Sequence, residues 1–167
     1  MKLMTSSRRI VLATLLAGIG APALAATATS TFTVNGTVVA TCSVSATALN
    51  FGASIPTPVN SNIDATSTIT ATCSNAVPFS VALNAGNGAG ATVVTRKMSS
   101  GPNTVNYAMY TDAGRTTVWG DGTPGSSINT LTGTGAAQAI PVYGRIPTGQ
   151  TPAIGTYSDT ILVTLTF

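Results

Sequence analysis

The clearest alternation of hydrophobic and polar residues runs from Ser30 to Cys42. Mostly apolar or small side chains occupy the even positions: Ser30, Phe32, Val34, Gly36, Val38, Ala40 and Cys42. Mostly polar side chains occupy the odd positions: Thr31, Thr33, Asn35, Thr37, Val39 and Thr41. Successive side chains of a strand point to opposite faces, so the pattern predicts a strand with one apolar face. Because this strand exceeds the usual length of about five or six residues, we expect it to serve two purposes in sequence.

The C-terminal residues alternate in the same way. Ile161, Val163, Leu165 and Phe167 share one face, and Thr160, Leu162, Thr164 and Thr166 share the other. The pattern predicts a strand that continues to the last residue. Chain ends usually fray, so a strand here is expected to be held by its neighbours.

Shorter alternating runs lie between these two segments. They predict strands at 68–73, 79–84, 105–109 and 140–146, separated by turn signals such as 84–90, 121–125 and 148–155. Short strands at this spacing are typical of an antiparallel β-sandwich. We therefore predict an all-β fold in a single domain, with no internal repeat.

The first 25 residues have the composition of a secretory signal peptide. Lys2, Arg8 and Arg9 precede an apolar run at 10–17, and the stretch ends on the small-residue pattern of 23–25. The apolar run is too short to span a bilayer. We expect cleavage after Ala25, and we exclude residues 1–25 from the fold.

Removing this segment changes the charge of the protein. The full chain has seven Lys and Arg against four Asp, a net charge of +3, and three of those cations lie in the predicted signal peptide. Four cations and four Asp remain, so the mature chain is neutral. Nucleic-acid binding requires a basic surface and is therefore not expected. Low charge also leaves little electrostatic repulsion between copies of the chain.

The chain has two cysteines, Cys42 and Cys73. An even pair of this kind in an exported protein predicts a disulfide. The alternative, a metal site, would need further ligands, and the sequence contains no His.

The residue types needed for catalysis are largely missing. The chain has no His and no Glu, and general acid–base catalysis usually relies on His or paired carboxylates. The glycine run at 86–90 is not followed by the Lys-Ser/Thr of a phosphate-binding loop. We predict that the protein is not an enzyme and has no catalytic residue, cofactor, metal site or small-molecule substrate.

Several segments resemble the spore coat protein U domain family. The segments NYAMYTD at 106–112 and RTTVWGDG at 115–122 resemble the central signature of that family. The segments VYGRIP at 142–147 and GTYSDT at 155–160 also resemble it, and the two cysteines and the C-terminal VTLTF fall where the family has them. Despite its name, the family is similar to the subunits of archaic chaperone–usher pili of the Csu type in Gram-negative bacteria.

The resemblance implies an immunoglobulin-like sandwich that lacks its last strand and is completed by a donated strand. A periplasmic chaperone would fill the open groove first, and the N-terminal strand of the next subunit would replace it. The resemblance assigns the donor strand to 26–37 and the pilin domain to 38–167. It implies a donor face made of Phe32, Val34, Gly36 and Val38. It implies a chaperone-contacting strand made of Ile161, Val163, Leu165 and Phe167.

The expected function is a structural subunit of a surface pilus that supports adhesion and biofilm formation. Its expected partners are the periplasmic chaperone, an outer-membrane usher, and copies of itself or related subunits. Export through the periplasm to the cell surface follows from this role. From the alternation alone, both terminal segments are typical of ordinary core strands in a complete sandwich. The alternatives are therefore a secreted spore-coat or matrix protein that folds as a complete sandwich, and a small lectin-like surface-binding module.

Overall fold

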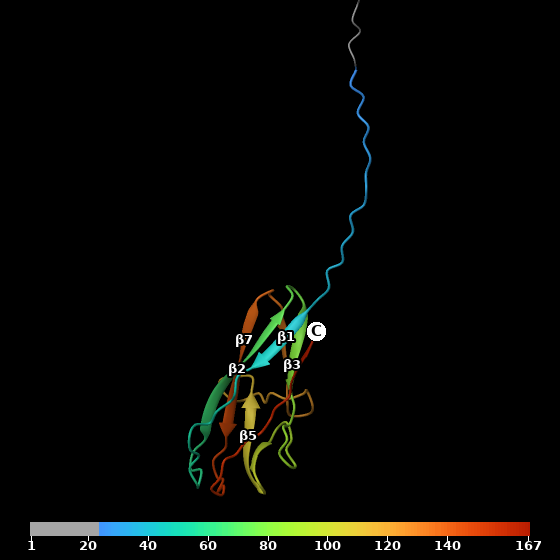
Figure 1. Ribbon diagram of the computed structural model, residues 1–167. Helices are drawn as coiled ribbons and strands as arrows, with labels where there is room; N and C mark the ends of the chain where they lie inside the picture. The colour runs from blue at the N-terminus through green and yellow to red at the C-terminus, as the bar shows by residue number, and fades with distance from the viewer. Residues whose placement is uncertain (1–23) are drawn as a thin grey trace, which may run out of the picture. The chain divides into compact units, whose positions relative to one another are not determined.

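The computed structural model describes residues 24–167, so nearly all of the predicted signal peptide lies outside the described residues (Figure 1). The chain divides after Thr37 into two units, which are described separately. Residues 24–37, the described part of the first unit, contain no strand, and every one of them is exposed.

The second unit, Val38–Phe167, contains eight strands and no helix. The strands are β1 (Cys42–Ala46), β2 (Ile63–Cys73), β3 (Pro78–Leu83), β4 (Arg96–Ser100), β5 (Asn103–Tyr110), β6 (Asn129–Thr132), β7 (Ala137–Ile146) and β8 (Val163–Thr166). All strand pairs are antiparallel. Within residues 24–167, no helix has the length and apolarity needed to cross a membrane.

Two sheets form the sandwich. The larger sheet has the strand order β1-β2-β7-β5-β4, and the smaller one has the order β6-β3-β8. The longest ladder joins β2 to β7 over ten pairs, from Ile63↔Ile146 to Thr72↔Ala137. This ladder makes β2 and β7 the rigid centre of the larger sheet.

The core lies between the two sheets. Alternate side chains of β2, β3, β5 and β7 point inward and are buried, as the period-2 pattern requires. The fully buried Trp119 follows β5, and its indole Nε1 donates to the carbonyl of Val81 at 2.9 Å. The core members are Val59, Ile69, Ala71, Cys73, Phe79, Val81, Leu83, Val105, Tyr107, Met109, Trp119, Ile140, Val142 and Ile146.

The strands predicted at 68–73, 79–84, 105–109 and 140–146 are confirmed as β2, β3, β5 and β7, and the all-β antiparallel fold is confirmed with them. The strands β4 and β6 were not predicted, because neither segment alternates clearly in sequence, and β1 was not predicted beyond Cys42.

The two predicted terminal strands differ from the structure. The strand predicted from Ser30 to Cys42 is wrong over nearly all its length: residues 30–41 form no strand, and β1 begins at Cys42 and continues to Ala46. Residues 30–40 have no partner strand to hydrogen-bond with in the described part of the chain. The C-terminal strand is limited to Val163–Thr166, the residues that pair with β3. Alternation therefore predicted extended backbone over a longer span than the ladders cover.

Candidate functional site: an open groove between two edge strands

The sandwich is open along one side, between β1 and β8. β1 is an edge strand of the larger sheet and pairs with β2, and β8 is an edge strand of the smaller sheet and pairs with β3. The two strands lie near each other, yet no ladder joins them in the described part of the chain. Each therefore leaves one row of backbone N–H and C=O groups without a strand partner.

A cavity of about 550 Å³ follows this opening. Its floor consists of core side chains from both sheets: Ile69, Leu83, Met98, Tyr107, Met109 and Val142. The hydrophobic core is thus accessible from the groove. Apolar residues at the bottom of an open β-edge favour an occupant that is itself a strand with one apolar face.

One wall of the groove is formed by the segment that continues β1, residues 46–55. Leu49 and Phe51 lie over Gly144 of β7, where an added Cβ would come within 2.6 Å of Leu49 Cδ2. The ring of Phe51 contacts Tyr107 edge to face, with the ring centroids 5.9 Å apart. Gly144 therefore lets this segment pack closely against the sheet.

The opposite wall is formed by residues 157–163, which lead into β8. Asp159 is the charged residue of this wall, and it accepts hydrogen bonds from Tyr107 Oη at 2.7 Å and from the backbone of Asn87 at 2.7 Å. Burial, together with the bond to Asp159, raises the pKa of Tyr107 well above its ordinary value. The phenol therefore stays a hydrogen-bond donor, and it fixes the wall across the groove.

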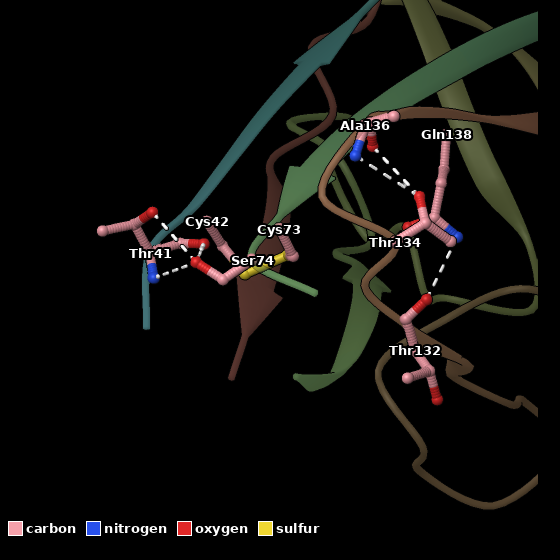
Figure 2. Close-up of a disulfide and its surroundings, with 8 residues drawn as sticks. All are labelled: Thr41, Cys42, Cys73, Ser74, Thr132, Thr134, Ala136 and Gln138. Atoms are coloured by element: carbon pink, nitrogen blue, oxygen red, sulfur yellow. Dashed lines mark hydrogen bonds between the residues drawn. A yellow bond between two sulfur atoms is a disulfide. The ribbon is translucent and has the colours of Figure 1, made fainter. Parts of the chain in front are cut away.

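The disulfide between Cys42 and Cys73 is confirmed, with its two sulfur atoms 2.02 Å apart. It joins the first residue of β1 to its direct partner at the end of β2. Figure 2 shows Thr41 beside Ser74, whose backbone N donates to the carbonyl of Thr41 at 2.9 Å. The backbone N of Thr41 donates in turn to Ser74 Oγ at 3.1 Å. The hydrogen bonding between the β1 and β2 segments thus extends one residue beyond the disulfide, to Thr41 and Ser74. The chain is therefore held to the sheet at the point where the N-terminal segment leaves it.

The residues predicted for the donor face are all exposed in the single chain. Phe32 is 87% exposed, Val34 80% and Val38 97%. Apolar side chains this close together along a chain are seldom all so exposed to solvent. An added Cβ at Gly36 would meet nothing within 4 Å. The donor role of these residues is a prediction that the isolated chain does not test.

The residues predicted for chaperone contact lie in β8 and immediately before and after it. Ile161 and Val163 line the cavity, and Leu165 is partly buried against the core. Phe167 is 59% exposed. Their contact with a chaperone also stays a prediction.

Sequence reasoning missed Arg96, the one buried charged residue among those described. Its guanidinium donates to four backbone carbonyls, with Nη1 bonded to Val93 at 2.7 Å and Nη2 bonded to Trp119 at 2.9 Å and Leu83 at 3.2 Å. Nε donates to Asn84 at 2.9 Å. Burial lowers the pKa of Arg96. No alternation or motif around this residue in the sequence indicated that it is buried.

A second polar cluster lies on the outer face of the larger sheet. Arg145 donates two hydrogen bonds to Asp64 at 2.7 and 2.9 Å, and Arg115 lies 3.3 Å from the same carboxylate. The hydrogen bond from Arg145 is the main cause that lowers the pKa of Asp64.

Asp112 accepts hydrogen bonds from the backbone N–H groups of Thr116 and Thr117, as expected of a turn residue. In residues 24–167, no three side chains are arranged to hold a metal ion.

Comparison with known proteins places the chain in context. A family model described as the Spore Coat Protein U domain matches residues 28–164. Among curated proteins, the chain is similar to Protein U of Myxococcus xanthus, with 34% identity over 160 residues that cover 87% of this chain and 88% of that protein.

Among solved structures, the chain is similar to one in the CsuC–CsuE chaperone–tip adhesion subunit pre-assembly complex from archaic chaperone–usher Csu pili of Acinetobacter baumannii. The TM-score is 0.54 at 24% identity, and the match covers 78% of this chain. This chain spans 40% of the length of that one. The likeness supports the predicted immunoglobulin-like sandwich.

Proposed function

This chain belongs to the Spore Coat Protein U domain family, and we propose that it is a structural subunit of a chaperone–usher surface pilus. The observation that carries the proposal is the open groove, in which core side chains such as Ile69 and Met109 line a cavity between two unpaired strand edges. A strand from outside the domain would complete the fold.

The occupant of the groove in the pilus is the N-terminal segment of a neighbouring copy. Residues 26–37 act as the donor strand, and residues 38–167 form the domain that receives one. Main-chain hydrogen bonds to the free edges provide affinity, and Phe32 and Val34 place alternate side chains over the apolar floor. Val38, the last residue of the donor face, reaches the end of the groove. Gly36 contributes no side chain to the donor face, so this position fills no pocket of the groove.

Before assembly, the groove needs a temporary cover. An open edge above an accessible core promotes aggregation, so a periplasmic chaperone occupies it first and contacts the residues Ile161, Val163, Leu165 and Phe167. An outer-membrane usher then exchanges the chaperone for the next subunit's donor strand. The resulting fibre is exported to the cell surface and supports adhesion and biofilm formation. This structural role requires no catalytic group.

The experiment is electrophoresis of the mature protein, unheated beside boiled, with two matched variants. Phe32→Asn/Val34→Asn makes the apolar face of the donor polar, whereas Thr31→Asn/Thr33→Asn changes the opposite face. We expect a ladder of multimers that collapses on boiling in the wild type and in the threonine variant. The ladder should be lost in the Phe32/Val34 variant. Folded monomers in all three samples would instead favour a complete sandwich and refute strand exchange.

A second candidate, a spore-coat or matrix protein, is supported by the description of the family and by the 34% identity to Protein U. It predicts a monomer that melts cooperatively without any donated strand, together with expression during sporulation. The same gel therefore separates the two candidates.

A further inference from the structure

The groove has two distinct ends. Cys42, the first residue of β1, pairs with Cys73 at the end of β2, and β3 begins after a short turn. Ser80, near the start of β3, pairs with Thr166 at the end of β8. The start of β1 and the end of β8 therefore lie at the same end of the sandwich, where Figure 1 shows the C-terminus. We call this the disulfide end.

The other end of the groove is flanked by two loops. β1 runs away from the disulfide end and continues into residues 52–57, while residues 152–157 precede β8. These loops enclose a second cavity of about 360 Å³, which shares Gly52, Ile55 and Tyr157 with the groove. We call this the loop end; the groove continues into its cavity.

The direction of the donated strand decides how copies of the chain join. A strand antiparallel to β1 would leave the groove at the disulfide end. Each copy would then have its N-terminal donor segment and the exit of its groove at the same end, so that two copies would exchange donor strands and close into a two-fold dimer. A strand antiparallel to β8 leaves at the loop end and joins copies head to tail in an open chain. A fibre requires the second arrangement.

In that arrangement, the residues that follow the donor segment arrive at the loop end. Val38 is four residues beyond Val34, about 13 Å along an extended strand, and shares its face. Val38 and Val39 are 97% and 71% exposed in the single chain. Two adjacent valines in water at the link between subunits favour burial against an apolar surface.

The loop end carries such a surface in a fixed conformation. Ile154 projects from its loop with 98% of its surface exposed. Tyr157 Oη donates to the carbonyl of Ala153 at 2.8 Å, which closes the loop on itself. An added Cβ at Gly155 would lie 2.5 Å from Ser100 Oγ, so this loop also packs closely on the β4–β5 turn. The isoleucine is thus held outward.

We propose that the cavity between loops 52–57 and 152–157 is a second docking site, which receives Val38 and Val39 of the next copy beside Ile154. The inference rests on the proposed function and extends it: the groove binds the donor strand, and the loop end clamps the link that follows. The clamp sets the angle between consecutive subunits, since the link alone would leave that angle free.

The test is disulfide cross-linking in the assembled mature protein. The variant Val38→Cys/Ile154→Cys should give a ladder that survives boiling without reductant and disappears with reductant. Its matched control, Val38→Cys/Thr66→Cys, carries the second cysteine on the exposed outer face of β2 and should give only the heat-labile ladder. Equal cross-linking of the two variants overturns the clamp while leaving strand exchange intact. Absence of any unheated ladder in the wild type overturns both.

A second variant measures the contribution of the clamp. Ile154→Asn should fold like the wild type, because the side chain makes almost no contact within its own domain. We expect its multimers to dissociate at a lower temperature than those of the wild type. An unchanged dissociation temperature would overturn the clamp.

Discussion

Replacing Arg96 by methionine tests how much the hydrogen bonds of this buried guanidinium stabilise the fold. The substitution keeps an apolar stem of similar length and removes the guanidinium, which leaves four backbone carbonyls without their donor: those of Leu83, Asn84, Val93 and Trp119. These carbonyls belong to separate segments, so the guanidinium joins the end of β3 to the segment after β5.

The expected magnitude follows from the four hydrogen bonds. At a net value of about 1 kcal/mol each, their loss costs about 4 kcal/mol. Relief from burying a charge offsets part of this, so we expect a loss of about 3 kcal/mol in the free energy of unfolding. With a urea slope of about 1.5 kcal/mol/M, the unfolding midpoint should fall by about 2 M. The urea midpoint of Arg96→Lys should lie between those of the wild type and of Arg96→Met, because one ammonium cannot reach all four carbonyls.

The assay is urea unfolding followed by tryptophan fluorescence of the buried Trp119, at one protein concentration. The matched control is Lys97→Met on the same strand, whose Nζ makes one exposed bond to Ala89 O at 3.3 Å. That control should change the free energy of unfolding by less than about 1 kcal/mol. If Arg96→Met unfolds at the same urea concentration as Lys97→Met, the carbonyl cluster does not stabilise the fold and the reasoning fails.

Three further predictions concern stability. Cys42→Ser opens a loop of sequence separation 31 and should lower the free energy of unfolding by about 3–4 kcal/mol, to be measured against the wild type with and without reductant. Gly144→Ala brings a Cβ within 2.6 Å of Leu49 and should destabilise the domain by about 1–3 kcal/mol in thermal melts, whereas Gly149→Ala has open space and tests the strain of positive φ alone. Because the pKa of Asp64 is lowered in the folded protein, its ionised carboxylate adds to the free energy of unfolding. This contribution is fully present above the ordinary aspartate pKa of about 3.9 and is lost as the pH falls through the lowered pKa of the folded state. Asp64→Asn should therefore reduce the drop in urea midpoint between pH 7 and pH 3, and an undiminished drop would assign it to other groups.

Much of the fold could be predicted because its central strands alternate clearly. In β2, β3 and β7, every buried side chain lies on one face, so burial follows the period of two in the sequence. β5 follows the same period except at Ala108, which is buried on the opposite face. β4 lacks this signal because its first residue, Arg96, is buried through hydrogen bonds instead of apolarity. The pairing of β4 with β5 compensates for its weak pattern.

The candidate site was only partly predictable. Alternation at 30–42 showed an apolar face, but not whether its partner lies in the same chain. The groove itself depends on the spatial order of strands, which places β1 and β8 at two unpaired edges. Nor could the sequence show that Tyr107 and Asp159, 52 residues apart, meet across the wall of that groove.

The disulfide also determines how the domain bears a mechanical load. The N-terminal segment departs at the first residue of β1, so tension along it would peel β1 from β2 one pair at a time, starting at Cys42. Because Cys42 is bonded covalently to Cys73, the load passes instead to the end of β2. β2 is held to β7 by ten pairs, the longest ladder of the domain. Tension applied to the N-terminal segment therefore reaches the longest ladder of the domain without first separating β1 from β2.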